Sequence, residues 1–162
     1  MVTGLSRKKK SQAAHVEQLS RALDDLRKTA GELAEAIDRD AESYDAVMAA
    51  FKLPQGNEKE TRERTEAVER TTKGAAEVPL QVAERTVALF ERLGQLEGIV
   101  AASMRSDLQV ARLLAEAAAR GALANVEINL ASLKDTAYVL ATRAKIAALE
   151  PRLGNAPRAG SA

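Results

Sequence analysis

The sequence predicts an all-α protein, a bundle of about five helices that includes one long N-terminal helix and that we expect to form a dimer. Apolar residues recur at every third or fourth position through most of the chain, which is the spacing of one face of an α-helix. Ala, Leu, Val and Ile supply these residues, while aromatic residues make up only 2% of the sequence. A chain of 162 residues suits one domain, which we place at residues 1–150, followed by a disordered tail at 151–162.

The composition excludes several classes of function. Lys plus Arg (24) nearly balance Asp plus Glu (23), so no net charge favours nucleic acid or an anionic membrane surface. The absence of cysteine excludes thiolate catalysis and cysteine-based zinc sites, and a single histidine cannot form a multi-histidine metal site. No apolar run is long enough to span a membrane, and the N-terminus lacks the apolar core of a signal peptide. We therefore expect a cytoplasmic protein with no metal site.

The first residues have the pattern of the last turn of a helix. Met1 to Leu5 is mostly apolar and ends near Ser6. A basic segment, Arg7-Lys8-Lys9-Lys10, follows. Such a segment is either a solvated patch or an anion site at the start of the next helix, where free backbone N–H groups add positive potential. The spacing alone favours the solvated patch.

The long helix is expected over residues 11–53, and one acidic residue interrupts its apolar stripe. The stripe consists of Val16, Leu19, Leu23, Leu26, Ala30, Leu33, Ile37, Asp40, Tyr44, Val47 and Phe51. Asp40 is in the middle of the stripe, so we expect its carboxylate to be buried. A buried carboxylate needs a partner or a shifted pKa, which indicates either chemistry or a structural ion pair.

The middle of the chain predicts either two further helices or one kinked helix. A Pro-Gln-Gly turn ends the long helix, and Asn57 with Glu60 forms a capping-box-like start for a charged helix over 58–77. Pro79 then either kinks this helix or begins a new one, which continues to about Leu93.

Two asparagines interrupt the face of the following helix. Ser106 or Asp107 is expected to cap its N-terminus, and mostly small residues form the stripe beyond it. Asn125 and Asn129 lie one turn apart on this stripe. Their amides bond either each other and the backbone, or a ligand.

Asp135 is expected to cap the last helix, which continues to about Leu149 and ends at Pro151. The helices of a single antiparallel bundle do not cover the whole apolar stripe of so long a first helix. Self-association is therefore expected.

The residues from Asp38 to Pro54 have the sequence Asp-Arg-Asp-Ala-Glu-Ser-Tyr-Asp-Ala-Val-Met-Ala-Ala-Phe-Lys-Leu-Pro. This run strongly resembles the cyclodeaminase/cyclohydrolase family of folate enzymes, which includes formimidoyltetrahydrofolate cyclodeaminase and methenyltetrahydrofolate cyclohydrolase. Weaker matches occur in the same order along the chain, at Arg7-Lys8-Lys9-Lys10, Glu77-Val78-Pro79-Leu80, Ser106-Asp107, Asn125-Val126 and Ile128-Asn129-Leu130.

The resemblance implies a tetrahydrofolate derivative as substrate and no bound cofactor. In the deaminase reaction, N10 attacks the formimidoyl carbon on N5 and ammonia leaves; in the hydrolase reaction, water adds to the methenyl carbon and opens the ring. Both reactions pass through a tetrahedral carbon between two nitrogens and need a proton shuttle near neutral pH, for which a carboxylate of raised pKa is suited. Asp40 is the residue that we expect to be catalytic, and the choice between the two reactions stays open.

The resemblance also implies a set of substrate-binding residues. We expect the lysines, Lys9 for preference, to hold the glutamate tail of the substrate or to bias the pKa of Asp40, and the asparagines to bond the pterin edge. The complete set is Lys9, Lys10, Tyr44, Asp107, Asn125 and Asn129.

The lysines and Asp40 cannot meet within one helix. An unbroken helix from Lys9 to Asp40 would separate them by about 46 Å. They meet if the long helices of two copies pack antiparallel about a centre near Asp24, which would give a site shared between subunits.

Family members begin about one helix earlier, with a Pro-Gly-Gly-Gly-Ser loop that leads into a Gly/Ala-rich helix. The resemblance therefore implies that this chain lacks the family's N-terminal Gly-rich segment. The alternative to an enzyme is a non-catalytic helical dimer, a scaffold or a degenerate paralogue that has lost the N-terminal part of the site. The retained Asp40 and asparagines favour the enzyme.

Overall fold

The computed structural model describes residues 1–154 and is an all-α bundle, as predicted, with no strand in that range. Its five α-helices are α1 (Val2–Ser6), α2 (Val16–Phe51), α3 (Glu58–Gln95), α4 (Arg105–Leu130) and α5 (Thr136–Leu149). Three short 3-10 helices connect or extend them, at Lys10–His15, Ala102–Met104 and Glu150–Arg152.

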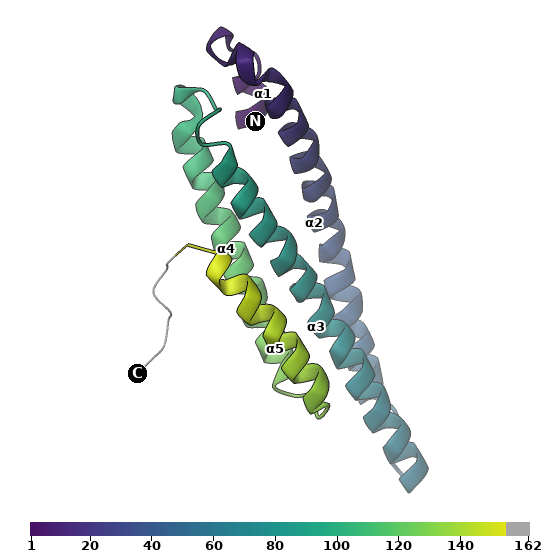
Figure 1. Cartoon of the computed structure of the whole chain (residues 1–162). Helices are drawn as coiled ribbons and strands as arrows, with labels where there is room; N and C mark the ends of the chain where they lie inside the picture. The colour runs from purple at the N-terminus through teal and green to yellow at the C-terminus, as the bar shows by residue number, and fades with distance from the viewer. Residues whose placement is uncertain (155–162) are drawn as a thin grey trace.

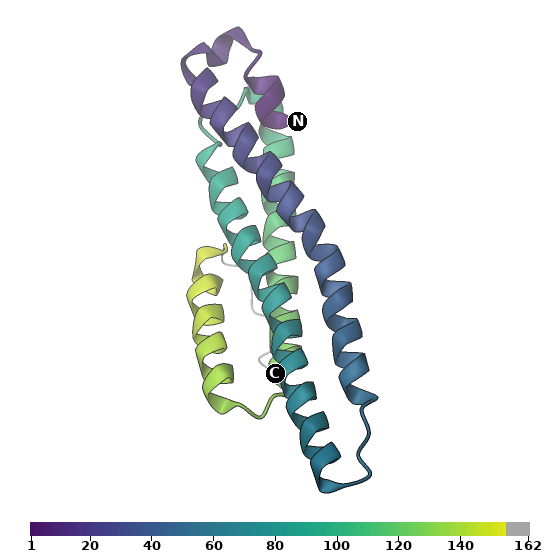
Figure 2. The same cartoon turned by 90° about the vertical axis from the view of Figure 1, so that its right-hand side faces the viewer.

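The three long helices α2, α3 and α4 run side by side, and α3 packs against both of the others (Figure 1). The shorter α5 folds back along α3 and α4, while α1 lies at the end of the bundle where α2 begins (Figure 2). No comparable packing joins α2 to α4. One side of the bundle is therefore left open between these two helices.

The apolar core has two parts, and α3 contributes to both. One part joins α3 to α4 and α5, and its members include Leu80, Val87, Val126 and Ile146. The other joins the N-terminal half of α2 to the end of α3 and the start of α4. Alanines between these larger side chains allow the helix axes to approach closely, as in other tightly packed bundles.

The predicted buried stripe of α2 is wrong in its C-terminal half. The helix begins at Val16 rather than Ser11, and its buried residues are Leu19, Ala22, Ala36 and Ala50. Ile37 is 72% exposed and Tyr44 is 63% exposed, so the stripe that carries them faces outwards in a single chain. The reason is that α3 contacts α2 along the neighbouring alanine positions, and apolar periodicity does not distinguish a covered face from an open one.

Pro79 neither divides α3 nor begins a new helix. The helix is continuous from Glu58 to Gln95, and its N-terminus is capped as predicted, because Asn57 Oδ1 accepts a hydrogen bond of 2.9 Å from the backbone N–H of Glu60. Proline has no N–H, so the carbonyl of Ala75 loses its helical donor. Asn129 Nδ2 donates to that carbonyl at 3.1 Å and thereby replaces the hydrogen bond that the proline cannot make.

The start of α4 differs from the prediction that Ser106 or Asp107 caps it. The helix begins at Arg105, its N-cap position is Met104, and no side chain caps it. Asp107 lies in the first turn instead, where a negative charge favours the helix dipole. The 3-10 helix before Arg105 shifts the start towards the N-terminus, which the sequence did not indicate.

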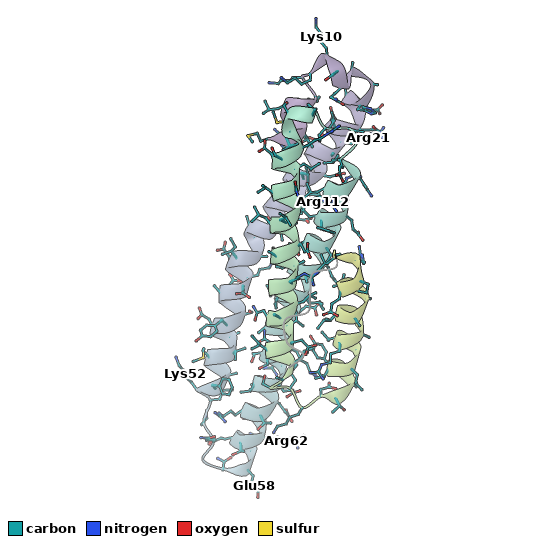
Figure 3. All side chains as sticks on the ribbon, turned by 90° about the vertical axis from the view of Figure 1, so that its left-hand side faces the viewer. Lys10, Arg21, Lys52, Glu58, Arg62 and Arg112 are labelled. Carbon is teal, nitrogen blue, oxygen red and sulfur yellow. The ribbon has the colours of Figure 1, made fainter. Side chains whose placement is uncertain are left out.

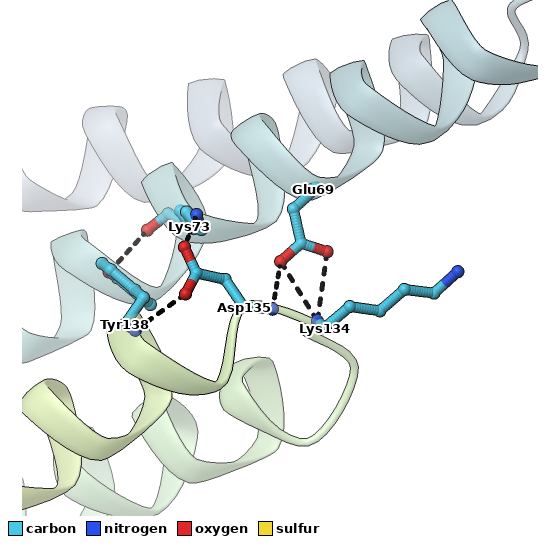
Figure 4. Close-up of polar contacts among 5 residues, drawn as sticks. All are labelled: Glu69, Lys73, Lys134, Asp135 and Tyr138. Atoms are coloured by element: carbon cyan, nitrogen blue, oxygen red, sulfur yellow. Dashed lines mark hydrogen bonds and ion pairs between the residues drawn. The ribbon is translucent and has the colours of Figure 1, made fainter.

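A polar cluster fastens the start of α5 to α3 (Figure 4). Glu69 accepts hydrogen bonds from the backbone N–H groups of Lys134 and Asp135, the second at 2.9 Å. Asp135 caps α5, as predicted, by accepting from the N–H of Tyr138 at 3.0 Å, and it pairs with Lys73 at 2.6 Å. The hydroxyl of Tyr138 donates to the carbonyl of Lys73. The end of this connection and the first turn of α5 are thus held by one face of α3.

This cluster predicts a loss of stability in acid. The hydrogen bond from Lys73 and that from the N–H of Tyr138 lower the pKa of Asp135. A carboxylate whose pKa is lowered in the folded state stabilises the protein above its unfolded pKa, and this contribution disappears as the pH falls below about 4. We expect the melting temperature of the Asp135→Asn variant to lie below that of the native chain at pH 7, and the two to converge in acid.

Asp38→Asn is the control for this acid effect, because Asp38 is exposed on α2 and away from the cluster. Its melting temperature is expected to follow the native chain at every pH. A constant difference between Asp135→Asn and the native chain from pH 7 to pH 3 would contradict the role assigned to the pair.

The predicted tail boundary at residue 151 falls too early. Residues 150–152 form a 3-10 helix, Arg152 pairs with Glu91 at 2.7 Å, and Leu153 is buried in the core beside α3 and α4. The rest of the predicted tail, residues 155–162, lies outside the described residues. Within residues 1–154, none of the helices combines the length and the apolar character that crossing a bilayer requires.

Candidate functional site

A groove of about 500 Å³ opens between α2, α3 and α4 on the side where α2 and α4 do not pack together. Its walls come from all three helices. They are Leu33, Ala36, Ile37 and Asp40 of α2, Val78, Pro79, Val82 and Thr86 of α3, and Ala118, Gly121, Ala122 and Asn125 of α4.

Small side chains create the space. Ala36 on one wall and Ala118, Gly121 and Ala122 on the other hold no bulky group. A Cβ atom added at Gly121 would meet no atom within 4 Å, so the glycine borders open volume rather than a tight helix contact. The stripe of small residues on α4 therefore opens the groove.

Asp40 lies in this groove, but it is exposed in the single chain and not buried as predicted. It is on the outward stripe of α2, with Ile37 one turn before it. The structure places no cation beside it among residues 1–154, so the predicted alternative of a structural ion pair is not observed within this range.

Asn125 lies on the opposite wall, on α4, and shares the groove with Asp40. Its side chain is exposed, and no residue within 1–154 bonds to its amide; its backbone carbonyl accepts from Asn129. The two polar residues that interrupt apolar stripes in the sequence thus come together from two different helices. A carboxylate and an amide on facing apolar walls can bond the polar edge of a flat ligand.

The other predicted binding residues lie elsewhere. Asn129 is one turn beyond the groove, and its amide is used by the carbonyls of Ala75 and Asn125. Tyr44 is exposed on α2 one turn beyond Asp40 and outside the groove walls. Asp107 lies 18 residues before Asn125 on the same helix, a separation of about 27 Å.

The two lysines are at the far end of the bundle. Lys9 and Lys10 are exposed at the start of the 3-10 helix that precedes α2, as the position of Lys10 in Figure 3 shows. Asp40 lies 24 residues beyond the first residue of α2, which is about 36 Å along the helix axis. A single chain therefore does not bring the lysines to Asp40, as the sequence predicted.

The floor of the groove was not predicted as part of a site. It is formed by α3 around Pro79, with Val78, Val82 and Thr86. The hydroxyl of Thr86 donates to the carbonyl of Val82 at 2.7 Å, so this side chain is used within its own helix. The one sequence signal at the floor is Pro79. A proline inside a helix leaves one backbone carbonyl without its helical donor, so another group must bond that carbonyl nearby.

A second cavity of about 570 Å³ lies near the C-terminal end of α3 and the start of α4. Its half-buried charged groups are paired, since Arg112 contacts Glu97 at 3.5 Å and the ring of Phe90, and Glu116 binds Arg120 at 2.8 Å. The groove that holds Asp40 and Asn125 offers uncommitted polar groups beside apolar walls. We therefore take it as the candidate site.

Comparison with known proteins gives matches along most of the chain. A protein-family model described as Formiminotransferase-cyclodeaminase matches residues 1–148. The formimidoyltransferase-cyclodeaminase of Sus scrofa is 30% identical over 149 residues, which are 91% of this chain and 28% of that protein. The protein of the same name from Rattus norvegicus is 33% identical over 131 residues, which are 81% of this chain and 24% of that protein.

A shorter relative and a solved structure also match. The methenyltetrahydrofolate cyclohydrolase of Methylorubrum extorquens is 32% identical over 128 residues, which are 77% of this chain and 59% of that protein. The chain thus spans less than two thirds of the length of each of these three relatives. The crystal structure of formiminotetrahydrofolate cyclodeaminase from Thermotoga maritima superposes with a TM-score of 0.74 at 22% identity, over 94% of this chain and 72% of that one, and supports the all-α fold.

Proposed function

The chain belongs to the formiminotransferase-cyclodeaminase family, and from this premise we propose that it acts on a tetrahydrofolate derivative at the carbon that bridges N5 and N10. The observation that carries the proposal is the groove that both Asp40 and Asn125 line, among mostly apolar side chains. Its volume of about 500 Å³ falls within the range of small-molecule sites, roughly 300–1,000 Å³. A pterin ring is flat, apolar on its faces and polar at its edges, which matches this distribution of side chains.

Two related reactions are open to such a site. In a cyclodeaminase, N10 of the folate attacks the formimidoyl carbon on N5, the carbon becomes tetrahedral, and its C–N bond to the departing nitrogen breaks as that nitrogen gains a proton and leaves as ammonia. In a cyclohydrolase, water adds to the methenyl carbon, loses a proton, and the bond to one ring nitrogen breaks as that nitrogen gains a proton. The names of the matched relatives include both activities.

Asp40 is the group that we assign to the proton transfer in either reaction. A carboxylate within reach of the bridging carbon can accept a proton from the attacking water or amine and return one to the leaving nitrogen. Asn125 offers an amide donor and an acceptor for the pterin edge. The apolar side chains of Ile37 and Val82 offer contacts to the faces of the ring.

The lysines remain part of the proposal only in an assembly of two chains. Since these lysines are distant from Asp40 of their own chain, we assign Lys9 and Lys10 to the negatively charged glutamate tail of a substrate bound in a neighbouring copy. The proposal therefore includes a homodimer, a soluble folate substrate and a cytoplasmic location.

The direct test follows the methenyl chromophore in a spectrophotometer. The purified chain is mixed with 5,10-methenyltetrahydrofolate and, separately, with 5-formimidoyltetrahydrofolate. Faster loss of the chromophore from the first compound supports a cyclohydrolase, and faster gain from the second supports a cyclodeaminase. A folded, helical chain that changes neither rate would overturn the enzymatic proposal and favour a non-catalytic helical scaffold.

Filling the groove is expected to slow turnover without unfolding the protein. The Gly121→Leu variant places a side chain in open volume, and replacing a helical glycine also favours the helix by roughly 0.5–1 kcal/mol. We expect kcat/KM to fall at least about tenfold because the leucine occupies the space of the ligand. The matched control is Gly74→Leu on α3, where a Cβ also meets nothing within 4 Å but which lies outside the groove. Equal activity in the two variants would show that substrate binds elsewhere.

A further inference from the structure

Two helical turns are joined at one end of the groove, one on α3 and one on α4. The two helices run antiparallel (Figure 1), so Pro79 and Asn125 lie at one level of the bundle, and Ala75 and Asn129 lie one turn away from them. Pro79 and Asn125 both line the groove, on its floor and its wall. A hydrogen bond of 3.1 Å joins Asn129 to Ala75. A turn of the floor is therefore fastened directly to a turn of the wall.

The acceptor of this hydrogen bond is available because residue 79 is a proline. In a regular helix the N–H of residue 79 would donate to the carbonyl of Ala75, and proline has no N–H. Ala75 is buried, and a buried carbonyl without a partner lowers the stability of a fold. The missing donor comes from Asn129, and so from a different helix.

The amide nitrogen of Asn129 donates to two backbone carbonyls. Its Nδ2 lies 3.1 Å from the carbonyl oxygen of Ala75 and 3.2 Å from that of Asn125, and an amide nitrogen carries two hydrogens. One acceptor is on α3, and the other is on the turn of α4 that carries the Asn125 side chain. Two directional bonds thus set the position of this turn along α3.

Apolar packing does not set that position equally well. The core between α3 and α4 contains Ala76, Leu80, Leu123 and Val126, and the hydrophobic effect that holds such residues together has no direction. A slip of one residue moves a helix by about 1.5 Å along its axis, which is enough to displace a binding group from its ligand. Buried polar groups specify the register of packed helices in other bundles.

We infer that Asn129 is a positioning residue, which holds Asn125 beside the floor of the groove through the carbonyl that Pro79 leaves open. The part of this inference that concerns turnover rests on the proposed function. The sequence placed Asn129 among the substrate-binding residues, whereas its amide nitrogen is used by two backbone carbonyls. Asn129 therefore acts on a substrate through Asn125.

A cycle of single and double variants in urea tests the link between Pro79 and Asn129. Asn129→Ala leaves the carbonyl of Ala75 without a donor, so we expect its urea midpoint to fall by about 0.5 M or more. In Pro79→Ala, the backbone N–H restored at position 79 bonds that carbonyl within α3. Adding Asn129→Ala to this variant should therefore not lower the midpoint further. Equal losses in the two backgrounds would overturn the link.

A thiol in the wall of the groove reports on the position of α4 without any substrate. Ala122 is half-buried on α4 and lines the groove, and the chain has no cysteine of its own. We expect alkylation of Ala122→Cys to become at least about threefold faster when Asn129→Ala is added, because a turn that is no longer held opens more often.

The matched control is Tyr138→Phe, which removes another side-chain hydrogen bond to a carbonyl of α3, that of Lys73, from outside the groove (Figure 4). Alkylation of Ala122→Cys should stay at its original rate in this background. An alkylation rate that Asn129→Ala leaves unchanged, or that both variants raise equally, would overturn the positioning role.

The separation of KM from kcat connects the inference to the proposed function. Asn125 is assigned to the pterin edge and Asp40 to proton transfer, so Asn129→Ala should raise KM at least about fivefold and change kcat by less than about twofold. Tyr138→Phe should leave both constants unchanged. A purely structural amide would lower the urea midpoint and leave KM of the folded enzyme as it was, which would overturn the inference. If the native chain turns over neither folate, the proposed function fails, while the urea and alkylation results still decide whether Asn129 positions this turn.

Discussion

We expect the Asp40→Asn variant to turn over its folate substrate about 10²–10⁴ times more slowly than the native chain, the usual contribution of a general acid or base. Asparagine keeps the shape of the side chain and its capacity to hydrogen bond, but it cannot take up and release a proton near neutral pH. The loss should therefore fall on kcat, with KM changed much less. Steady-state rates of the methenyl chromophore measure both constants.

Asp45→Asn is the control for this substitution. Asp45 is an exposed aspartate on the same helix and lies outside the groove walls, so its removal changes the net charge equally without touching the site. We expect its kcat to match that of the native chain. If Asp40→Asn retains kcat within about threefold, proton transfer is carried by another group, since a general acid or base is worth far more than that.

The second large effect concerns stability, and it is expected at Leu80 in the centre of α3. Leu80 is 1% exposed and belongs to the core that joins α3 to α4 and α5. Many of its neighbours are alanines, including Ala76, Ala83 and Ala119, and an alanine cannot extend into a cavity. The Leu80→Ala variant should therefore lose about 2–5 kcal/mol of the free energy of unfolding, which is the usual range for this change in a core.

Urea denaturation followed by circular dichroism checks this value at one fixed protein concentration. The midpoint of Leu80→Ala should fall by about 1 M or more. Leu140→Ala removes the same atoms from an exposed position on α5 and is expected to change the free energy of unfolding by no more than about 0.5 kcal/mol. Equal destabilisation by the two variants would contradict the placement of Leu80 in the core.

Local signals in the sequence predicted most of the helices and two of their starts. Asn57 and Asp135 cap α3 and α5 as expected, because a side chain that accepts from an N–H two or three residues later acts within one turn. The effect of Pro79 on its helix was ambiguous from the sequence. The free-energy cost of a proline inside a helix depends on whether another residue supplies the missing hydrogen-bond donor. That donor is Asn129, which is on a different helix.

The candidate site was predicted in part. Asp40 and Asn125 each stood out as a polar residue within an apolar stripe, and both line the groove. The floor around Val82 did not stand out, because an apolar residue in a helix has the same pattern whether it faces a core or a ligand. Tyr44 and Asp107 matched the family in sequence, yet in one chain they lie outside the groove.

The sequence by itself determined that the protein is all-α, where most helices lie, and that Asp40 and Asn125 differ from their surroundings. These properties depend on interactions within one or two helical turns. The tertiary structure decided which apolar stripe packs inside the bundle and which stays open, and it brought Asp40 and Asn125 into one groove. Periodicity predicts that a helix has an apolar face, but packing between distant segments decides which partner covers that face. Here α3 covers the alanines of α2 and leaves Ile37 and Asp40 outside.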